Sequence, residues 1–172
     1  MLRALQPAKN VRIEEITEQK GREQLLEYDG LLSAHNRGEF LDFLFTKSKV
    51  YIARWSPSLH SSMKEVDASS TTSIASSTAS TVAGYIAISR TDNRVLCLYA
   101  DVEDVAEALM GHHLKQSRAK NAILCCARNQ WAKLHSLGSF KSRVIYRRHT
   151  RAVPGNIKWE KIFGINVGMN LF

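Results

Sequence analysis

The chain has 172 residues, 44% of them hydrophobic and 23% charged, with a formal net charge of +8. This length allows one domain with a sizeable core, and the composition is that of an ordinary soluble protein. No apolar run approaches the ~18–20 residues that span a bilayer, so we expect no membrane association. The positive charge fits a nucleic acid, an anionic ligand or a solvated surface. Zinc-ligand spacing, aromatic RNA-binding signatures and helix-turn-helix turns are absent, so we do not expect a nucleic-acid partner.

Three cysteines occur in the chain: Cys97, Cys125 and Cys126. An odd number without regular spacing argues against a disulfide framework and predicts a reducing, cytoplasmic environment. All three lie in apolar, strand-like runs, where a free cysteine usually behaves as a small core residue.

The first part of the chain predicts a tail over residues 1–10, followed by a single domain over 11–172. Residues 11–17 alternate imperfectly and predict a strand. Within 21–45, leucines and phenylalanines recur at helical spacings, and two glycines divide the run into two helices or a bent pair. Residues 49–55 are rich in β-branched and aromatic residues and predict a second strand.

Residues 56–81 are dominated by Ser, Thr and Ala. Such a segment cannot bury enough apolar surface to offset its ordering entropy, so we expect a flexible loop. Residues 82–90 and 94–100 then predict an antiparallel hairpin around the turn residues Thr91, Asp92 and Asn93.

A continuous apolar stripe predicts an amphipathic helix, formed by Val102, Val105, Ala106, Leu109, Met110, His113 and Leu114. Residues 121–128 form an apolar run typical of a fully buried strand. Three further elements are predicted: a helix over 129–138, a strand over 142–150 and a strand-like piece within 159–172. The fold class is therefore α/β in the broad sense (α+β), with a mixed, mostly antiparallel central sheet and helices on both faces.

This order of elements resembles the GNAT superfamily, the Gcn5-related N-acetyltransferases. The residues that carry the resemblance most specifically are Asn129, Ala132, Leu134, Gly138 and Phe140. They are similar to the family's N-x-x-A-x-x-L-Y-x-x-x-G-F signature, with one extra residue between the last two. The stretches LYADVEDVAEALM and SRVIYRRHT…KIFGINVG are most similar to the YitH/HolE type of GNAT-like domain.

The resemblance implies a fold that binds acetyl-CoA where the fourth and fifth strands splay apart. Its implied reaction transfers the acetyl group to an amine of a small molecule or a protein. The residues implied to contact the cofactor are Leu98, Tyr99, Ala100, Asn129 and Ala132. No metal is implied, and either a homodimer or a tandem GNAT partner domain would fit the family.

Two residues are candidates for the acid that protonates the leaving thiolate. His135 occupies the place where the signature usually has Tyr, and an imidazole can serve as the acid. Tyr146 offers a phenol on the following predicted strand. Each has a structural alternative: His135 could lie at a helix surface, Tyr146 could pack in the core, and Asn129 could act as a plain helix N-cap.

The turn expected to hold the cofactor's pyrophosphate departs from the family pattern. It reads YADVEDVAEAL, without glycine, and carries Asp101, Glu103 and Asp104. Two like charges ~4 Å apart repel by about 1 kcal/mol even in bulk water. We expect Asp101 to cap the helix with Asp104 at the third helical position, and pyrophosphate binding to be weakened or lost. A catalytically inactive GNAT-like binding module is therefore the alternative function.

Metal chemistry is not expected from the adjacent His112 and His113. Neighbouring residues on a helix point about 100° apart, so these imidazoles cannot form a metal-binding pair.

Overall fold

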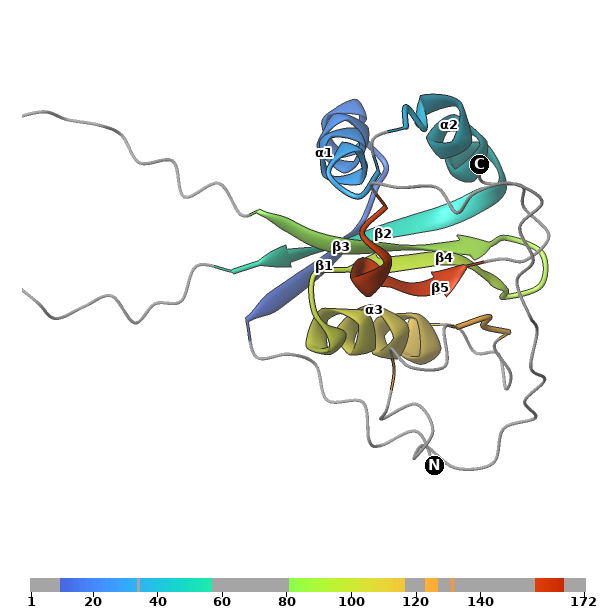
Figure 1. The fold of residues 1–172 in the computed structure, drawn as a ribbon. Helices are drawn as coiled ribbons and strands as arrows, with labels where there is room; N and C mark the ends of the chain where they lie inside the picture. Colours follow the sequence, from blue (N-terminus) through green and yellow to red (C-terminus); the bar gives the residue numbers. More distant parts are fainter. Residues whose placement is uncertain are drawn as a thin grey trace, which may run out of the picture.

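The computed structural model describes residues 10–33, 35–56, 81–116, 123–126, 131 and 157–165. These residues form a mixed α and β structure with three α-helices and a five-stranded antiparallel sheet of order β1-β2-β3-β4-β5 (Figure 1). No helix in these ranges is long and apolar enough to cross a membrane.

The elements follow the predicted order closely in the first two thirds of the chain. Their bounds are β1 Val11–Glu15, α1 Gln19–Gly30, α2 Gly38–Lys47, β2 Ser48–Trp55, β3 Val82–Ser89, β4 Val95–Ala100, α3 Glu103–Gln116, the 3₁₀ helix η2 Trp159–Lys161 and β5 Ile162–Ile165. The predicted helical pair is therefore two separate helices.

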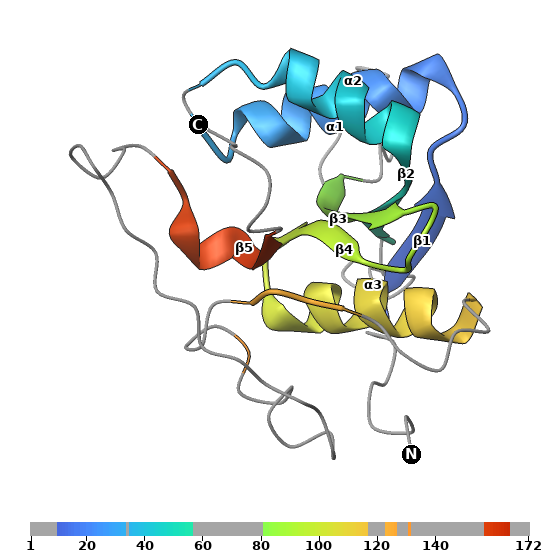
Figure 2. The ribbon, with the colours of Figure 1, turned by 90° about the vertical axis from the view of Figure 1, so that its right-hand side faces the viewer.

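The sheet lies between two helical layers, with α1 and α2 on one face and α3 on the other (Figure 2). Side chains alternate between the faces along each inner strand, as the pleat requires. Ile86, Leu98 and Ala100 belong to the core cluster on the α3 side, whereas Tyr85 and Tyr99 belong to the cluster under α1 and α2. The prediction of helices on both faces of a mostly antiparallel sheet is confirmed for this part of the chain.

The predicted hairpin is present as β3 and β4, which pair Gly84 with Ala100 and Ala87 with Cys97. Its turn contains Asn93 at φ 53°, a left-handed conformation that Asn tolerates better than most residues. Gly84 is needed at its position, because a Cβ there would lie 2.6 Å from the Tyr99 carbonyl oxygen.

Two sequence predictions need correction. The run 121–128 is not a fully buried strand where it is described: residues 123–126 form an isolated parallel bridge, between Arg94 and Ile123, and the Ile123 side chain is exposed. The Cys125 carbonyl also accepts a hydrogen bond from the Ile165 amide of β5 at 2.9 Å. An apolar run indicates burial on average, yet here β5 takes the place beside β4. Val102 is also exposed, because α3 begins one residue later.

Several predictions fall outside the described residues. They concern the tail before residue 10, the interior of the 56–81 segment, the helix over 129–138 except for Trp131, and the strand over 142–150.

Candidate functional site

The three predicted cofactor residues of β4 are completely enclosed by the fold. Leu98 and Ala100 are 0% exposed and Tyr99 is 1% exposed. A ligand could therefore reach this part of β4 only through its backbone. The backbone edge of β4 that faces away from β3 is paired with β5, since Leu98 lies opposite Gly164 and Tyr99 opposite Ile162. The remaining predicted site residues, Asn129, Ala132, His135 and Tyr146, lie outside the described residues.

Beneath α1 and α2, four polar side chains form a buried cluster that we call the Arg37 network: Asp29, Arg37, Tyr85 and Tyr99. The Arg37 Nε lies 3.3 Å from Asp29 Oδ2. Its Nη2 donates hydrogen bonds to the Tyr99 hydroxyl at 3.1 Å and the Tyr85 hydroxyl at 3.4 Å. Tyr85 in turn donates to Asp29 Oδ1 at 2.5 Å, so the hydrogen-bond chain returns to the same carboxylate.

Aromatic rings enclose the Arg37 guanidinium. Its central carbon lies 4.8 Å from the Phe40 ring centre and 5.0 Å from that of Tyr99. The rings of Tyr85 and Tyr99 are themselves 5.0 Å apart. Aromatic faces stabilise a desolvated cation more strongly than they stabilise one at the protein surface. Together with the ion pair, this fixes the short connection between α1 and α2 onto the centre of the sheet.

Burial also decides the protonation chemistry of this network. It raises the pKa of Asp29, against the opposing effects of Arg37 and Tyr85. It raises the pKa values of Tyr85 and Tyr99, so both phenols stay protonated near neutral pH, and the Tyr85 hydroxyl donates to Asp29. Burial likewise raises the pKa of the neighbouring Cys97 thiol to about 12, which excludes a thiolate nucleophile there. The Arg37 network can therefore position β4, but it offers no solvent-accessible acid or nucleophile.

A second polar group, which we call the Asp101 ion pair, lies at the turn between β4 and α3. Lys161 Nζ lies 2.7 Å from Asp101 Oδ1. The same oxygen accepts a hydrogen bond from the Tyr28 hydroxyl at 3.0 Å. Burial and the Asp101 carboxylate both raise the pKa of Tyr28. Because Tyr28 precedes Asp29 in α1, this group adjoins the Arg37 network.

The predicted capping role of Asp101 is wrong. The carboxylate contacts of Asp101 go to α1 and η2, while the first bonds of α3 are accepted by the Val102 carbonyl from the amides of Val105 and Ala106. A capping pattern in a sequence cannot reveal a competing lysine that lies 60 residues away. Glu103 and Asp104 do lie in the first turn of α3, as predicted, where the helix dipole favours carboxylates.

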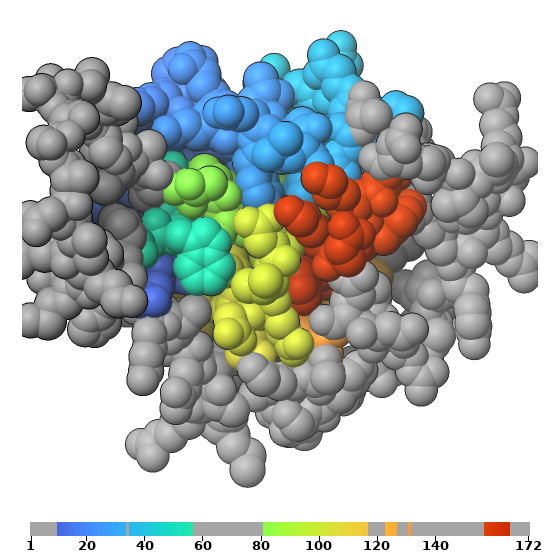
Figure 3. Space-filling view, turned by 60° about the vertical axis from the view of Figure 1, so that its left-hand side comes forward, coloured from blue at the N-terminus to red at the C-terminus, as the bar shows by residue number. Residues whose placement is uncertain are grey.

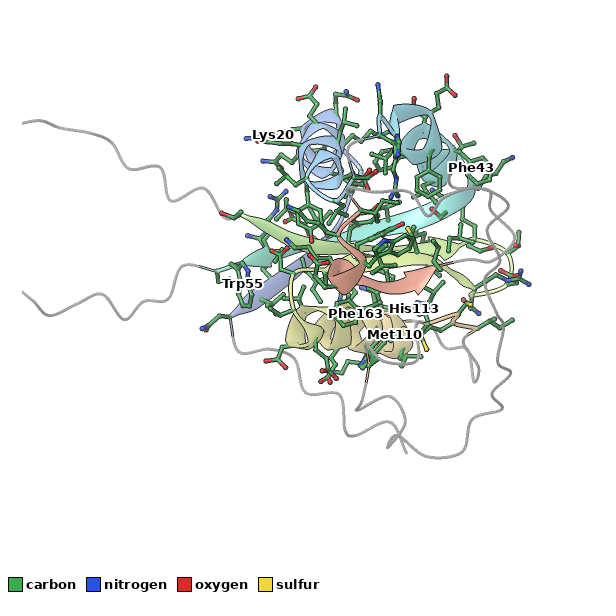
Figure 4. The ribbon with its side chains drawn as sticks, in the orientation of Figure 1. Lys20, Phe43, Trp55, Met110, His113 and Phe163 are labelled. Atoms are coloured by element: carbon green, nitrogen blue, oxygen red, sulfur yellow. The ribbon has the colours of Figure 1, made fainter. Side chains whose placement is uncertain are left out.

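The α3 side of the sheet is apolar, with a few enclosed polar atoms. Phe163, Met110 and His113 all lie between the sheet and α3 (Figure 4). The Trp131 side chain is 0% exposed and meets the Phe163 ring edge-on, with centroids 6.0 Å apart, so it packs in the core on this side. Burial lowers the pKa of His113. No group of three or more His, Cys, Asp or Glu residues within the described ranges could hold a metal.

Sequence reasoning missed the most extensive polar cluster described. One signal was available, because Asp29 follows Leu25 by four residues and so shares the inward face of α1. A carboxylate at a core position needs a partner in the fold. The sequence contains 24 lysines and arginines, and nothing local to Arg37 marks it as that partner.

Comparisons of the chain with known protein families, curated proteins and solved structures found no match.

Proposed function

We propose that the protein is a GNAT-like acyltransferase that takes acetyl-CoA as acyl donor and an amine as acceptor. The observation that carries the proposal is the arrangement β1–α1–α2–β2–β3–β4–α3, in which α1 and α2 cover one face of an antiparallel meander and α3 covers the other. It agrees with the broader expectation of a mostly antiparallel sheet with helices on both faces. The donor would lie along the backbone of Leu98–Ala100, with Asn129 and Ala132 as its further contacts.

In this proposal, His135 or Tyr146 protonates the leaving thiolate. The described residues contribute a positioning role: the Arg37 network holds the Tyr99 hydroxyl, and through it the β4 segment, in place. A reacting group that is held within a few tenths of an ångström of its productive position reacts far faster than one attached to a mobile strand.

Calorimetric titration with acetyl-CoA tests the proposal. We expect micromolar binding that weakens with added salt and with Asn129→Ala. The exposed Asn10, immediately before β1, supplies the control Asn10→Ala, which should leave the affinity unchanged. The acyltransferase proposal is rejected if no heat of binding appears at ~1 mM acetyl-CoA, either for wild-type protein or for variants that relieve charge repulsion or strand pairing at the donor site; that concentration corresponds to about 4 kcal/mol of binding free energy.

A second candidate function, a GNAT-like binding module without catalysis, is favoured by the turn before α3. The helix end carries Glu103 and Asp104, and Lys161 is paired with Asp101 in the turn that precedes it. Phosphates approaching this end meet carboxylates instead of open backbone amides.

The double variant Glu103→Gln/Asp104→Asn separates the two candidates, because it removes both charges while keeping side-chain size. If repulsion alone weakens donor binding, the affinity for acetyl-CoA rises by roughly thirty-fold, as expected for two removed repulsions of about 1 kcal/mol each. If neither wild type nor the variant binds acetyl-CoA, the binding module is the better description.

A further inference from the structure

Residues 157–165 form a continuous piece of chain that we call the C-terminal strap. It begins beside the α1–α2 connection, where the Lys158 amide donates to the Leu32 carbonyl at 3.0 Å. It then passes through η2 and ends as β5 on the edge of β4. The space-filling view shows the strap in red against the blue of α1 and the yellow of the β4–α3 turn (Figure 3).

The strap covers the stretch of β4 that the proposed function assigns to the acyl donor. Its four-residue strand pairs Gly164 with Leu98 and Ile162 with Tyr99. The contact is close: a Cβ on Gly164 would lie 2.7 Å from Leu124 Cδ1 and 3.2 Å from Leu98 Cβ. While β5 stays paired, no ligand can use the hydrogen-bonding groups of β4 along this edge.

One ion pair ties the strap to the turn before α3. Lys161 is the last residue of η2, immediately before β5, and its Nζ lies 2.7 Å from Asp101 Oδ1. The two side chains are 25% and 29% exposed, so water and salt reach the pair and it is weak enough to open. Asp101 remains held by Tyr28 at 3.0 Å and by its own amide bond to the Ala83 carbonyl, so release of Lys161 frees the strap and leaves the turn in place.

We propose that the C-terminal strap is an autoinhibitory element and that the Asp101–Lys161 ion pair is its latch. Opening of the latch lifts β5 from β4 and exposes the backbone of Leu98–Ala100. A phosphate-bearing donor competes with Asp101 for Lys161, so the donor itself favours opening. The inhibitory role rests on the proposed function, whereas the latch can be measured without it.

Hydrogen exchange measured by mass spectrometry on the full chain tests the latch. In Lys161→Gln, peptides covering 157–165 should exchange about two- to five-fold faster than in wild type, the effect expected for losing a partly exposed ion pair. The control is Lys158→Gln, an equal charge change at an exposed position on the same strap. The latch is overturned if both variants exchange at the wild-type rate or accelerate equally.

A second variant, Gly164→Ala, loosens β5 without removing the Lys161 charge, because its Cβ would lie 3.2 Å from the Leu98 Cβ on the paired strand β4, closer than an ordinary van der Waals contact. Titration of acetyl-CoA into wild type, Lys161→Gln and Gly164→Ala then tests inhibition. Affinity for acetyl-CoA that rises together with strap exchange in Gly164→Ala supports the proposal, and unchanged affinity despite faster exchange overturns it. If strap exchange rises while no form binds acetyl-CoA, the latch stands and the acyltransferase function fails.

Discussion

Replacing Arg37 with Met should be among the most destabilising changes in the described part of the chain. The substitution keeps a long apolar side chain but leaves the Asp29 carboxylate, on a residue only 2% exposed, without its cation. Removing one partner of a buried ion pair typically costs about 3–5 kcal/mol. The Tyr85 and Tyr99 hydroxyls also lose the donor that they share. We therefore expect the free energy of unfolding to fall by about 3–5 kcal/mol.

Urea denaturation followed by tryptophan fluorescence and circular dichroism measures this loss. The control is Arg94→Met, which removes an exposed ion pair to Asp92 at 3.2 Å and should cost less than about 1 kcal/mol. The double variant Arg37→Met/Asp29→Asn no longer buries an unpaired charge. It should recover part of the loss, with a coupling free energy of at least about 1 kcal/mol. Equal effects of the Arg37 and Arg94 substitutions would refute the reasoning, since the network would then contribute no more than a surface pair.

Two further predictions concern the sheet and α3. Gly84→Ala places a methyl group 2.6 Å from the Tyr99 carbonyl oxygen and 2.9 Å from the Ala100 Cα, so it should cost about 1–3 kcal/mol in urea denaturation. Gly30→Ala, which meets no atom within 4 Å, should be neutral or stabilising. Because burial holds the pKa of His113 below its usual value near ~6.5, the unfolded chain binds a proton that the folded chain resists. Stability should therefore fall as the pH drops below about 6.5. His113→Gln should flatten that part of the pH dependence; a slope unchanged in His113→Gln would show that this imidazole is not its source.

The amphipathic stripe of α3 shows that a local sequence pattern can predict which side chains of a helix are buried. Val105, Ala106, Leu109, Met110 and His113 are all buried as predicted, because one helical face meets one sheet face. The hairpin of β3 and β4 could also be predicted from the sequence, since its turn residues lie between two apolar runs. Val102 was misplaced because sequence patterns locate the interior of a helix better than its first residue.

The partners of the buried polar side chains could not be predicted from local sequence patterns. Asp101 was assigned to the helix next to it in sequence, yet its carboxylate contacts Tyr28 and Lys161. Asp29 and Arg37 are separated by eight residues, and their partners Tyr85 and Tyr99 come from strands far along the chain. Each of these polar groups forms its hydrogen bonds or ion pairs with residues at irregular separations in the sequence.

The sequence by itself determined the element order from β1 to α3 and the inward face of α3, because apolar residues at helical spacing must be buried on one side. Tertiary structure alone decided which polar groups meet, and that β5 rather than residues 123–126 lies along β4 at Leu98 and Tyr99. Apolar burial is non-directional and can be read from composition and period. Ion pairs and strand pairing depend on distances between atoms that only the folded chain brings together.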